Sequence, residues 1–371
     1  NVGDIQDGSG FRRMRLSAKG AVAENVNYFA QLDFGFFGRP SFTDVWGEVT
    51  KVPVLGNVRV GQWKQPFGLE TVTSVRYQPF LERSLLFQAF HPFRHIGAGF
   101  YDVNEEQTAT WAASVFRTGQ DQFGNDITDD GGFSSAGRVT YLPYFEDHKD
   151  KTLDYLHLGA AYWFGTPDNQ RFRYATIPEA FVGAFGVPAG SVPGTSKVNV
   201  PSIANGTPPF ADTGTFGVNT FAHFGSEFLW VRGPLSIQSE SMLANVERPG
   251  LRSLMFWGSY LEGTYFLTGE SRTYDRKAGA LDRITPIRPF IPDACGDYGP
   301  GAWEALFRVS HIDLSDAEIR GGYQTDLTAG LNWYLNGYTK FQLNYIRAML
   351  DKAPAGASRA DIAGVRFQVD F

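Results

Sequence analysis

Polar and apolar residues alternate along much of this chain, and segment 25–36 shows the pattern clearly. One set of alternate positions is apolar: Val26, Tyr28, Ala30, Leu32, Phe34 and Phe36. The intervening set is polar, with the aromatic Phe29 as the exception: Asn25, Asn27, Phe29, Gln31 and Asp33. Because successive side chains of a β-strand point to opposite faces, this pattern predicts a strand with one apolar and one water-facing side.

The same alternation recurs to the end of the chain and predicts an all-β protein of about fifteen strands. The predicted strands are 11–20, 25–36, 42–51, 57–65, 94–102, 108–118, 135–144, 155–165, 217–232, 234–246, 253–268, 303–313, 323–335, 338–349 and 360–371. Most have about ten residues, the length that a tilted strand needs to cross a membrane. No helical periodicity and no interdomain linker interrupts the series, so residues 1–371 are expected to form a single domain.

Turns and four long connections separate the predicted strands. Asn336-Gly337 is typical of a two-residue hairpin turn. The long connections are 66–93, 119–134, 166–216 and 269–302, and the third, of about fifty residues, is rich in Pro and Gly. An unstructured connection of that length is unusual in a compact soluble domain. It is ordinary on the outer side of a membrane barrel.

Composition and charge narrow the class of protein. The chain contains no apolar run of about 20 residues, so membrane-spanning helices are excluded. The mean hydropathy is only −0.23 although 43% of the residues are hydrophobic, which fits strands that hide a membrane signal in alternation. A net charge of −6 makes nucleic acid an unexpected partner. The single cysteine, Cys295, excludes an internal disulfide, and the polar start at Asn1 predicts that an export signal has been removed.

The strand count gives the chain a direction. Bacterial single-chain membrane barrels have an even number of strands, so about fifteen visible strands predict a sixteenth. A strand upstream of Asn1 would place 66–93, 119–134 and 166–216 outside the cell, and 269–302 with the C-terminus in the periplasm. The alternative is a strand hidden within 66–93, which would send much of that segment elsewhere. We favour the upstream strand.

Several motifs, in order along the chain, resemble the phosphate-selective porin O and P family. They are Phe11-Arg12-Arg13-Met14-Arg15-Leu16, Val60-Gly61-Gln62-Trp63-Lys64-Gln65-Pro66-Phe67-Gly68-Leu69-Glu70, Leu81-Glu82-Arg83, Tyr265-Phe266-Leu267-Thr268-Gly269-Glu270, Gly301-Ala302-Trp303-Glu304 and Gly330-Leu331-Asn332-Trp333-Tyr334-Leu335-Asn336. Each motif alone is weak, but together they are fairly specific. The resemblance implies a sixteen-stranded trimeric barrel in the bacterial outer membrane, with its first strand upstream of Asn1. It also implies that the outer loops 66–93 and 166–216 and the periplasmic turn 269–302 fold into the interior.

Phosphate selectivity is a separate expectation, because the chain departs from the family at one position. In the family that this chain resembles, phosphate-selective members carry a Lys directly after the Gly-Leu-Glu of the third loop. This chain has Thr71 at that position. The arginine-rich run of the fifth loop is matched only by Arg171 and Arg173. A site without that ammonium group should hold phosphate less tightly. A weak anion preference is therefore expected, with a phosphate- or polyphosphate-selective channel as the alternative.

Basic residues predict a route for anions through the interior. The candidate pore-lining residues are Arg13, Arg15, Lys19, Arg59, Arg76, Arg83, Arg171 and Arg173, together with Asp44. Arginine and lysine rings select anions because a narrow, partly desolvated pore weakens screening. The alternative is an ordinary polar interior in which these cations pair with the acidic residues Asp33, Asp44, Glu48, Glu70 and Glu82.

The expected function is an outer-membrane porin that passes small polar solutes and inorganic anions without catalysis, cofactor or metal. A barrel enzyme would need polar residues clustered on the apolar strand faces, and the sequence shows none. A soluble all-β binding protein would bury those faces instead, and would not need detergent for extraction.

The last strand carries a further expectation about partners. Residues 361–371 alternate, and one face is apolar up to the terminal aromatic: Ala363, Val365, Phe367, Val369 and Phe371. The family resemblance implies that barrel-assembly machinery reads such an ending. We therefore expect outer-membrane lipid, the assembly machinery and two further copies of the chain as partners.

Overall fold

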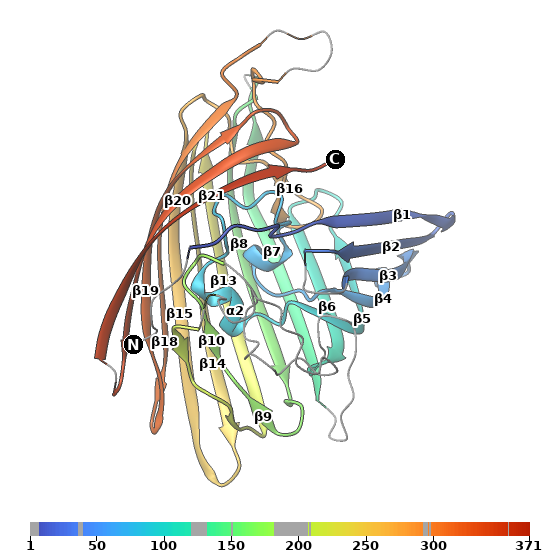
Figure 1. The fold of residues 1–371 in the computed structure, drawn as a ribbon. Coiled ribbons are helices and arrows are strands. Elements are labelled where there is room, and N and C mark those ends of the chain that lie inside the picture. The colour runs from blue at the N-terminus through green and yellow to red at the C-terminus, as the bar shows by residue number, and fades with distance from the viewer. Residues whose placement is uncertain are drawn as a thin grey trace.

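A computed structural model describes residues 7–35, 40–119, 132–149, 151–181, 207, 209–291, 296, 298–354 and 356–371. Fifteen strands form one antiparallel sheet, in which each strand pairs with the next long strand along the chain (Figure 1). In sheet order they are β1 (Arg15–Ala23), β2 (Val26–Asp33), β3 (Ser41–Val52), β4 (Gly56–Lys64), β5 (Arg94–Val103), β6 (Ala109–Arg117), β7 (Phe133–Asp147), β8 (Leu153–Gly165), β13 (Thr220–Arg232), β14 (Leu235–Arg248), β15 (Leu251–Phe266), β18 (Ala302–Asp316), β19 (Ile319–Tyr334), β20 (Thr339–Lys352) and β21 (Gly356–Val369). The fifteen predicted strands are confirmed. The sixteenth stays a prediction, with β1 and β21 at the two edges of the described sheet.

Short elements occupy the long connections. The segment 65–93 contains two helices, α1 (Leu69–Val72) and α2 (Leu85–Phe90). Three two-stranded pairs lie in the other connections: β9 (Arg171–Phe172) with β12 (Phe216–Gly217), β10 (Ala175–Thr176) with β11 (Ala211–Asp212), and β16 (Tyr274–Asp275) with β17 (Ala280–Leu281). Among the described residues, no helix is both long and apolar enough to cross a membrane.

The up-and-down order sorts the connections between two ends of the sheet. Because neighbouring strands are antiparallel, the connections that follow β4, β6 and β8 share one end. The connection between β15 and β18 lies at the opposite end, where β21 also finishes. The long connections are thus divided between the two ends as the strand count predicted, and which end faces outward stays a prediction. Cys295 and the acidic part of the connection after β6 lie outside the described residues.

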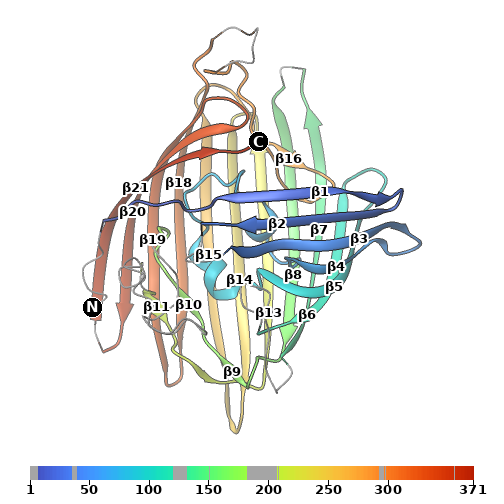
Figure 2. The same cartoon turned by 45° about the vertical axis from the view of Figure 1, so that its right-hand side comes forward.

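The sheet wraps around part of its own chain. Strands β1–β5 run across the front of the molecule, while β13–β19 stand upright behind them (Figure 2). Helix α2 lies beside the upright strands β14, β15 and β18 (Figure 1). Most residues of the two helices are buried, including Leu69, Leu85 and Phe90.

Charged side chains of the sheet are buried and apolar ones are exposed, which is the reverse of the distribution in a soluble protein. On β15, Glu262 is 3% exposed while its neighbour Leu261 is 56% exposed. On β18, Arg308 is 1% exposed while Phe307 is 51% exposed. Burying charged groups and exposing apolar ones is costly in water, but suits a barrel whose outer face contacts hydrocarbon. This distribution opposes the soluble all-β alternative.

Candidate functional site

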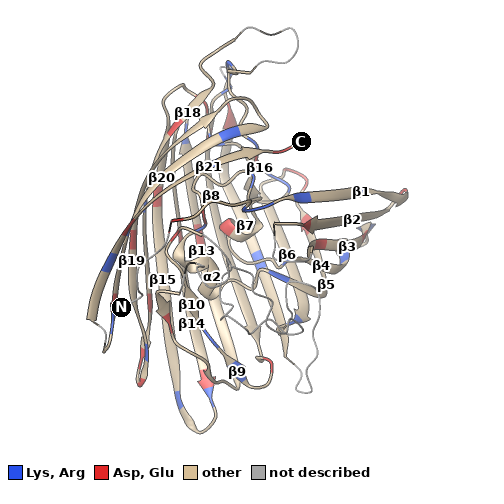
Figure 3. Ribbon diagram, in the orientation of Figure 1, with Lys and Arg blue, Asp and Glu red and all other residues tan. Residues whose placement is uncertain are grey.

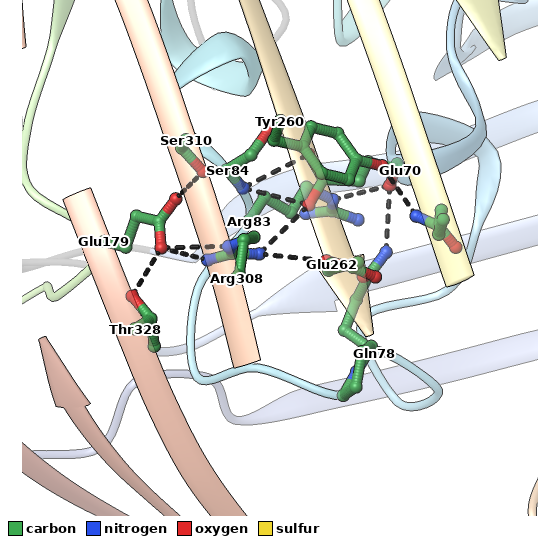
Figure 4. A network of polar contacts seen from close by, with 12 residues as sticks. Glu70, Gln78, Arg83, Ser84, Glu179, Tyr260, Glu262, Arg308, Ser310 and Thr328 are labelled. Carbon is green, nitrogen blue, oxygen red and sulfur yellow. Dashed lines mark hydrogen bonds and ion pairs between the residues drawn. The ribbon is translucent and has the colours of Figure 1, made fainter. Parts of the chain in front are cut away.

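A buried ionic network holds the segment 65–93 against the inner face of the sheet. Its centre is Arg308 on β18, whose guanidinium lies 2.6 Å from Glu179, 3.5 Å from Glu70 and 3.6 Å from Glu262 (Figure 4). The same guanidinium donates a hydrogen bond of 3.0 Å to the backbone carbonyl of Glu82. One side chain thus joins two connections to the wall, because Glu70 lies in the connection after β4 and Glu179 in the connection after β8.

Further wall residues satisfy the backbone of the same segment. The carboxylate of Glu240 on β14 accepts hydrogen bonds from the backbone N–H groups of Leu69 (2.8 Å) and Glu70 (2.9 Å). From the other side, Lys340 donates to the carbonyl of Gln78 at 2.9 Å. Buried backbone groups need such partners, so the polar inner face of the wall determines where the segment lies.

The connection between β15 and β18 enters the interior from the opposite end. Its hairpin is held by the Tyr274 hydroxyl, 2.6 Å from Nδ1 of His157. At the tip, Arg138 donates to the carbonyl of Gly279 at 2.7 Å. The N–H of Leu281 donates to Oγ1 of Thr73 at 3.2 Å, so segments that enter from opposite ends meet at Thr73.

An open cavity of about 1870 Å³ remains beside these inserted segments, lined mainly by β1–β6, by β21 and by the chain ahead of β1. Eleven basic residues line it: Arg12, Arg13, Arg15, Lys19, Arg59, Lys64, Arg76, Arg94, Arg138, Lys277 and Arg366. Six acidic residues line it: Asp7, Asp33, Asp44, Glu82, Asp102 and Asp370. The described wall is therefore positive, although the whole chain carries a net charge of −6.

Most of the sequence-predicted residues meet at this cavity. Arg13, Arg15, Lys19, Arg59, Arg76 and Asp44 all line it. Arg83 does not; it is buried, and donates to the backbone carbonyls of Glu70 (2.6 Å) and Thr73 (3.1 Å). Arg171 is exposed on β9, and Arg173 pairs with Asp212 at 2.8 Å, also away from the cavity.

Carboxylates compensate several of the cations, as the polar-interior alternative expected. Arg15 pairs with Asp33 (2.8 Å) and Arg59 with Glu48 (2.6 Å) on neighbouring strands, whereas Arg94 on β5 reaches across β4 to Asp44 on β3 (2.6 Å). Basic and acidic positions lie side by side on β1–β5 (Figure 3). A register shift between β2 and β3 turns Thr43 and Asp44 to the same side, which brings Asp44 to Arg94.

The carboxylate of Glu82 forms ion pairs with three arginines. Its carboxylate lies 2.8 Å from Arg12, 3.4 Å from Arg13 and 2.6 Å from Arg366. Burial alone would raise the pKa of Glu82, but the three guanidinium groups hold it well below its ordinary value. The group stays ionised, and its surroundings keep an excess of positive charge. It also links the chain ahead of β1 to β21, the two edges of the sheet.

Lys64 is a candidate site residue that was not singled out from the sequence. Its ammonium group donates to the backbone carbonyls of Thr73 (2.8 Å) and Val72 (3.4 Å), and no described carboxylate lies within ion-pair distance. The side chain of Thr71 turns away from the cavity and hydrogen-bonds Nδ1 of His91. Lys64 thus supplies a cation from β4 beside the position where the family resemblance implies a lysine. Its place in the Val60–Glu70 motif was a signal that could have found it.

Comparison with known proteins agrees with this geometry. The model of the family described as phosphate-selective porin O and P matches residues 1–371. Porin O of Pseudomonas aeruginosa is 24% identical over 376 residues, covering 94% of this chain and 78% of the relative. An uncharacterized protein of Caulobacter vibrioides is also 24% identical over 386 residues, covering 98% of this chain and 68% of the relative.

Solved structures share the fold at low sequence identity. OprB of Pseudomonas putida matches with a TM-score of 0.54 at 9% identity, over 97% of this chain and 87% of that one. The L8 deletion mutant of Vibrio cholerae OmpT matches with a TM-score of 0.52 at 12% identity, over 97% and 91%. An anion-selective porin of Comamonas acidovorans matches with a TM-score of 0.50 at 11% identity, over 98% and 87%. With an all-β fold of porin type, a charged cavity and a family match over its whole length, the chain belongs to the phosphate-selective porin O and P family of bacterial outer-membrane channels.

Proposed function

We propose that this outer-membrane channel passes small hydrophilic solutes with a preference for inorganic anions. The proposal rests on the charge of one cavity wall, which is lined by eleven basic residues and only six acidic ones. Fixed charges along a narrow, low-dielectric passage raise the local concentration of counter-ions, and salt screens them less than charges on an open surface. Arg13, Arg15, Lys19, Arg59 and Arg76 contribute to this field.

The preference is expected to be weak, because neighbouring carboxylates match many of the cations. Arg15, Arg59 and Arg94 each share a close carboxylate. The uncompensated charge comes from residues such as Lys19 and Lys64, together with the surplus around Glu82. Such an arrangement attracts anions into the passage but does not form a binding site that surrounds one anion.

A phosphate-selective channel is the second candidate, and Lys64 is the observation that favours it. Its ammonium group sits at the carbonyls of Val72 and Thr73, directly after Thr71, without a carboxylate partner among the described residues. An ammonium group has three donors, and the one that these two carbonyls leave over is a good partner for a phosphate oxygen. In this candidate, β4 would replace the lysine that the third loop lacks.

Planar-bilayer recordings across a KCl gradient test the proposal. The reversal potential of the native channel is expected to show chloride preferred over potassium, and Lys64→Gln is expected to reduce that preference. Lys149→Gln is the matched control, because Lys149 is exposed in the turn between β7 and β8 and does not line the cavity. A native channel without anion preference would overturn the proposal. Block of the chloride current by micromolar phosphate would favour the second candidate.

We further propose that the channel works as a homotrimer, and that no catalysis takes place in it. One solved relative in fold, Vibrio cholerae OmpT, is described in a trimer form, with a TM-score of 0.50. A curated relative of this chain is named Porin O, which supports a channel over an enzyme. Light scattering of the detergent-solubilised protein tests the assembly, and a mass of one protomer would contradict it.

A further inference from the structure

Three aromatic rings stand on the water-facing side of β2, β3 and β5. Phe29 is the residue that breaks the alternation of its strand, and its ring stacks on Trp46 with centroids 5.7 Å apart and an interplanar angle of 20°. The guanidinium of Arg59 lies 3.9 Å from the ring centroid of Trp46 and 4.9 Å from that of Tyr101. All four residues line the cavity. We call Phe29, Trp46 and Tyr101 the aromatic shelf.

Arg59 contributes a flat surface to the shelf more than a free charge. Its guanidinium lies 2.6 Å from Glu48, and the Tyr101 hydroxyl donates to the same carboxylate at 2.6 Å. The uncompensated cation beside the shelf is Lys19. It stands opposite Phe29 in the β1–β2 pairing, is exposed, and has no carboxylate partner among the described residues.

Ring faces on a wetted wall are expected to serve a solute that also has a ring. Apolar surface exposed to water is unfavourable, and a stacked ring removes it from water on both partners. Aromatic side chains bind flat organic rings in this way without requiring a particular pattern of hydrogen bonds. Inorganic phosphate has no surface that could cover the shelf, so the shelf adds nothing to the binding of that ion.

We propose that the aromatic shelf and Lys19 form a binding site for ring-bearing organic phosphates, with the ring stacked on Phe29 and Trp46 and the phosphate at the Lys19 ammonium. The proposal rests on the proposed anion passage, since the site lies on the wall of the same cavity. It adds a substrate class, phosphate monoesters with a flat ring, to the inorganic anions considered above.

Titration of the chloride current in planar bilayers tests the site with three probes: AMP, ribose 5-phosphate and inorganic phosphate. At about pH 8 all three carry close to two negative charges, so they differ mainly in what the phosphate is attached to. The measured quantity is the concentration at half-block, which separates affinity from the size of the blocking molecule. In the native channel, AMP is expected to block at a concentration about tenfold lower than phosphate, with ribose 5-phosphate between them.

Variants of the full chain separate the shelf from its surroundings. Phe29→Leu and Trp46→Leu keep an apolar side chain but remove the ring, and each is expected to shrink the advantage of AMP to about twofold or less. Phe42→Leu is the matched control, because Phe42 lies on the outward face of β3 and is 46% exposed. The control is expected to keep the tenfold advantage. Heat-dependent mobility in gel electrophoresis and unchanged half-block by phosphate show that each variant is folded and open.

The possible results are distinguishable. Equal half-block concentrations for AMP and phosphate in the native channel would overturn the proposed binding site, even where the reversal potential shows an anion preference. An AMP advantage that survives both Phe29→Leu and Trp46→Leu would also overturn it. A native channel without anion preference would instead remove the underlying passage.

Discussion

Replacing Arg308 with methionine would remove the cation at the centre of the buried network. Glu179, Glu70 and Glu262 lie 2.6, 3.5 and 3.6 Å from its guanidinium, and all of these side chains are at most 4% exposed. Removing one partner of a buried ion pair typically costs about 3–5 kcal/mol, because the other charge is left buried and uncompensated. Since several carboxylates share Arg308, we expect a loss in the upper part of that range.

Urea unfolding of the refolded protein, followed by tryptophan fluorescence, measures this loss. The matched control is Arg252→Met, because Arg252 is 66% exposed and pairs with Asp316 at the rim. An exposed pair contributes about 0–1 kcal/mol, so this variant should unfold almost like the native protein. We also expect Arg308→Met to raise the open-channel conductance, because the segment 65–93 loses its main tie to β18.

A second substitution tests the cause of the loss. Ser310 (2.5 Å) and Thr328 (2.8 Å) donate to the two different carboxylate oxygens of Glu179. With glutamine in its place, the amide oxygen can accept from one hydroxyl and the NH2 group can donate to the other. Adding Glu179→Gln to Arg308→Met should therefore recover part of the stability by removing one unpaired charge. An Arg308→Met variant that loses no more stability than Arg252→Met would refute this reasoning.

Three further predictions concern other parts of the channel. Burial, reinforced by Arg83, lowers the pKa of His91 to about 3, so the unfolded chain gains the proton first as the pH falls below about 6.5. Stability should then fall by up to a few kcal/mol between about pH 6.5 and 3, and less in His91→Asn, as urea unfolding at each pH would show; equal pH slopes would count against this. Glu82→Gln removes the one carboxylate that pairs with three arginines, so the reversal potential should move closer to the equilibrium potential of chloride. A shift towards the equilibrium potential of potassium would contradict a role of Glu82 in limiting the positive charge of the cavity. Phe371→Ala should reduce the amount of folded protein in outer membranes without changing refolding in detergent, as quantitative blotting would measure; equal amounts would exclude a role in assembly.

The strands could be predicted because each carries its own signal. Alternation depends on neighbouring residues only, so even β21 was located from its own residues, although its pairing with β20 is a tertiary contact. Phe29 stood out in the sequence because it interrupts the alternation of its strand. Its stacking on Trp46 could not be seen there, because Trp46 lies on another strand. Alternation thus located the strands of the sheet, but it did not show which residues meet across the interior.

The side-chain contacts of the interior could not be predicted, because they join residues far apart in the chain. Arg308 and Glu179 are 129 positions apart, and neither was singled out from the sequence. Arg83, a candidate for the anion path, instead binds backbone carbonyls inside the segment 65–93. The basic lining was expected from individual residues, whereas the net charge of −6 gave no sign of it because that charge is an average over the whole chain.

The meeting of two inserted segments at Thr73 bears on how such channels could be recombined. The carbonyl of Thr73 accepts from Lys64 and Arg83, while its hydroxyl oxygen accepts from the N–H of Leu281. A graft of the segment 65–93 into a relative would arrive without its partner from the opposite rim. Chimeric channels should therefore exchange that segment and the hairpin ending at Leu281 together, as one transplantable unit.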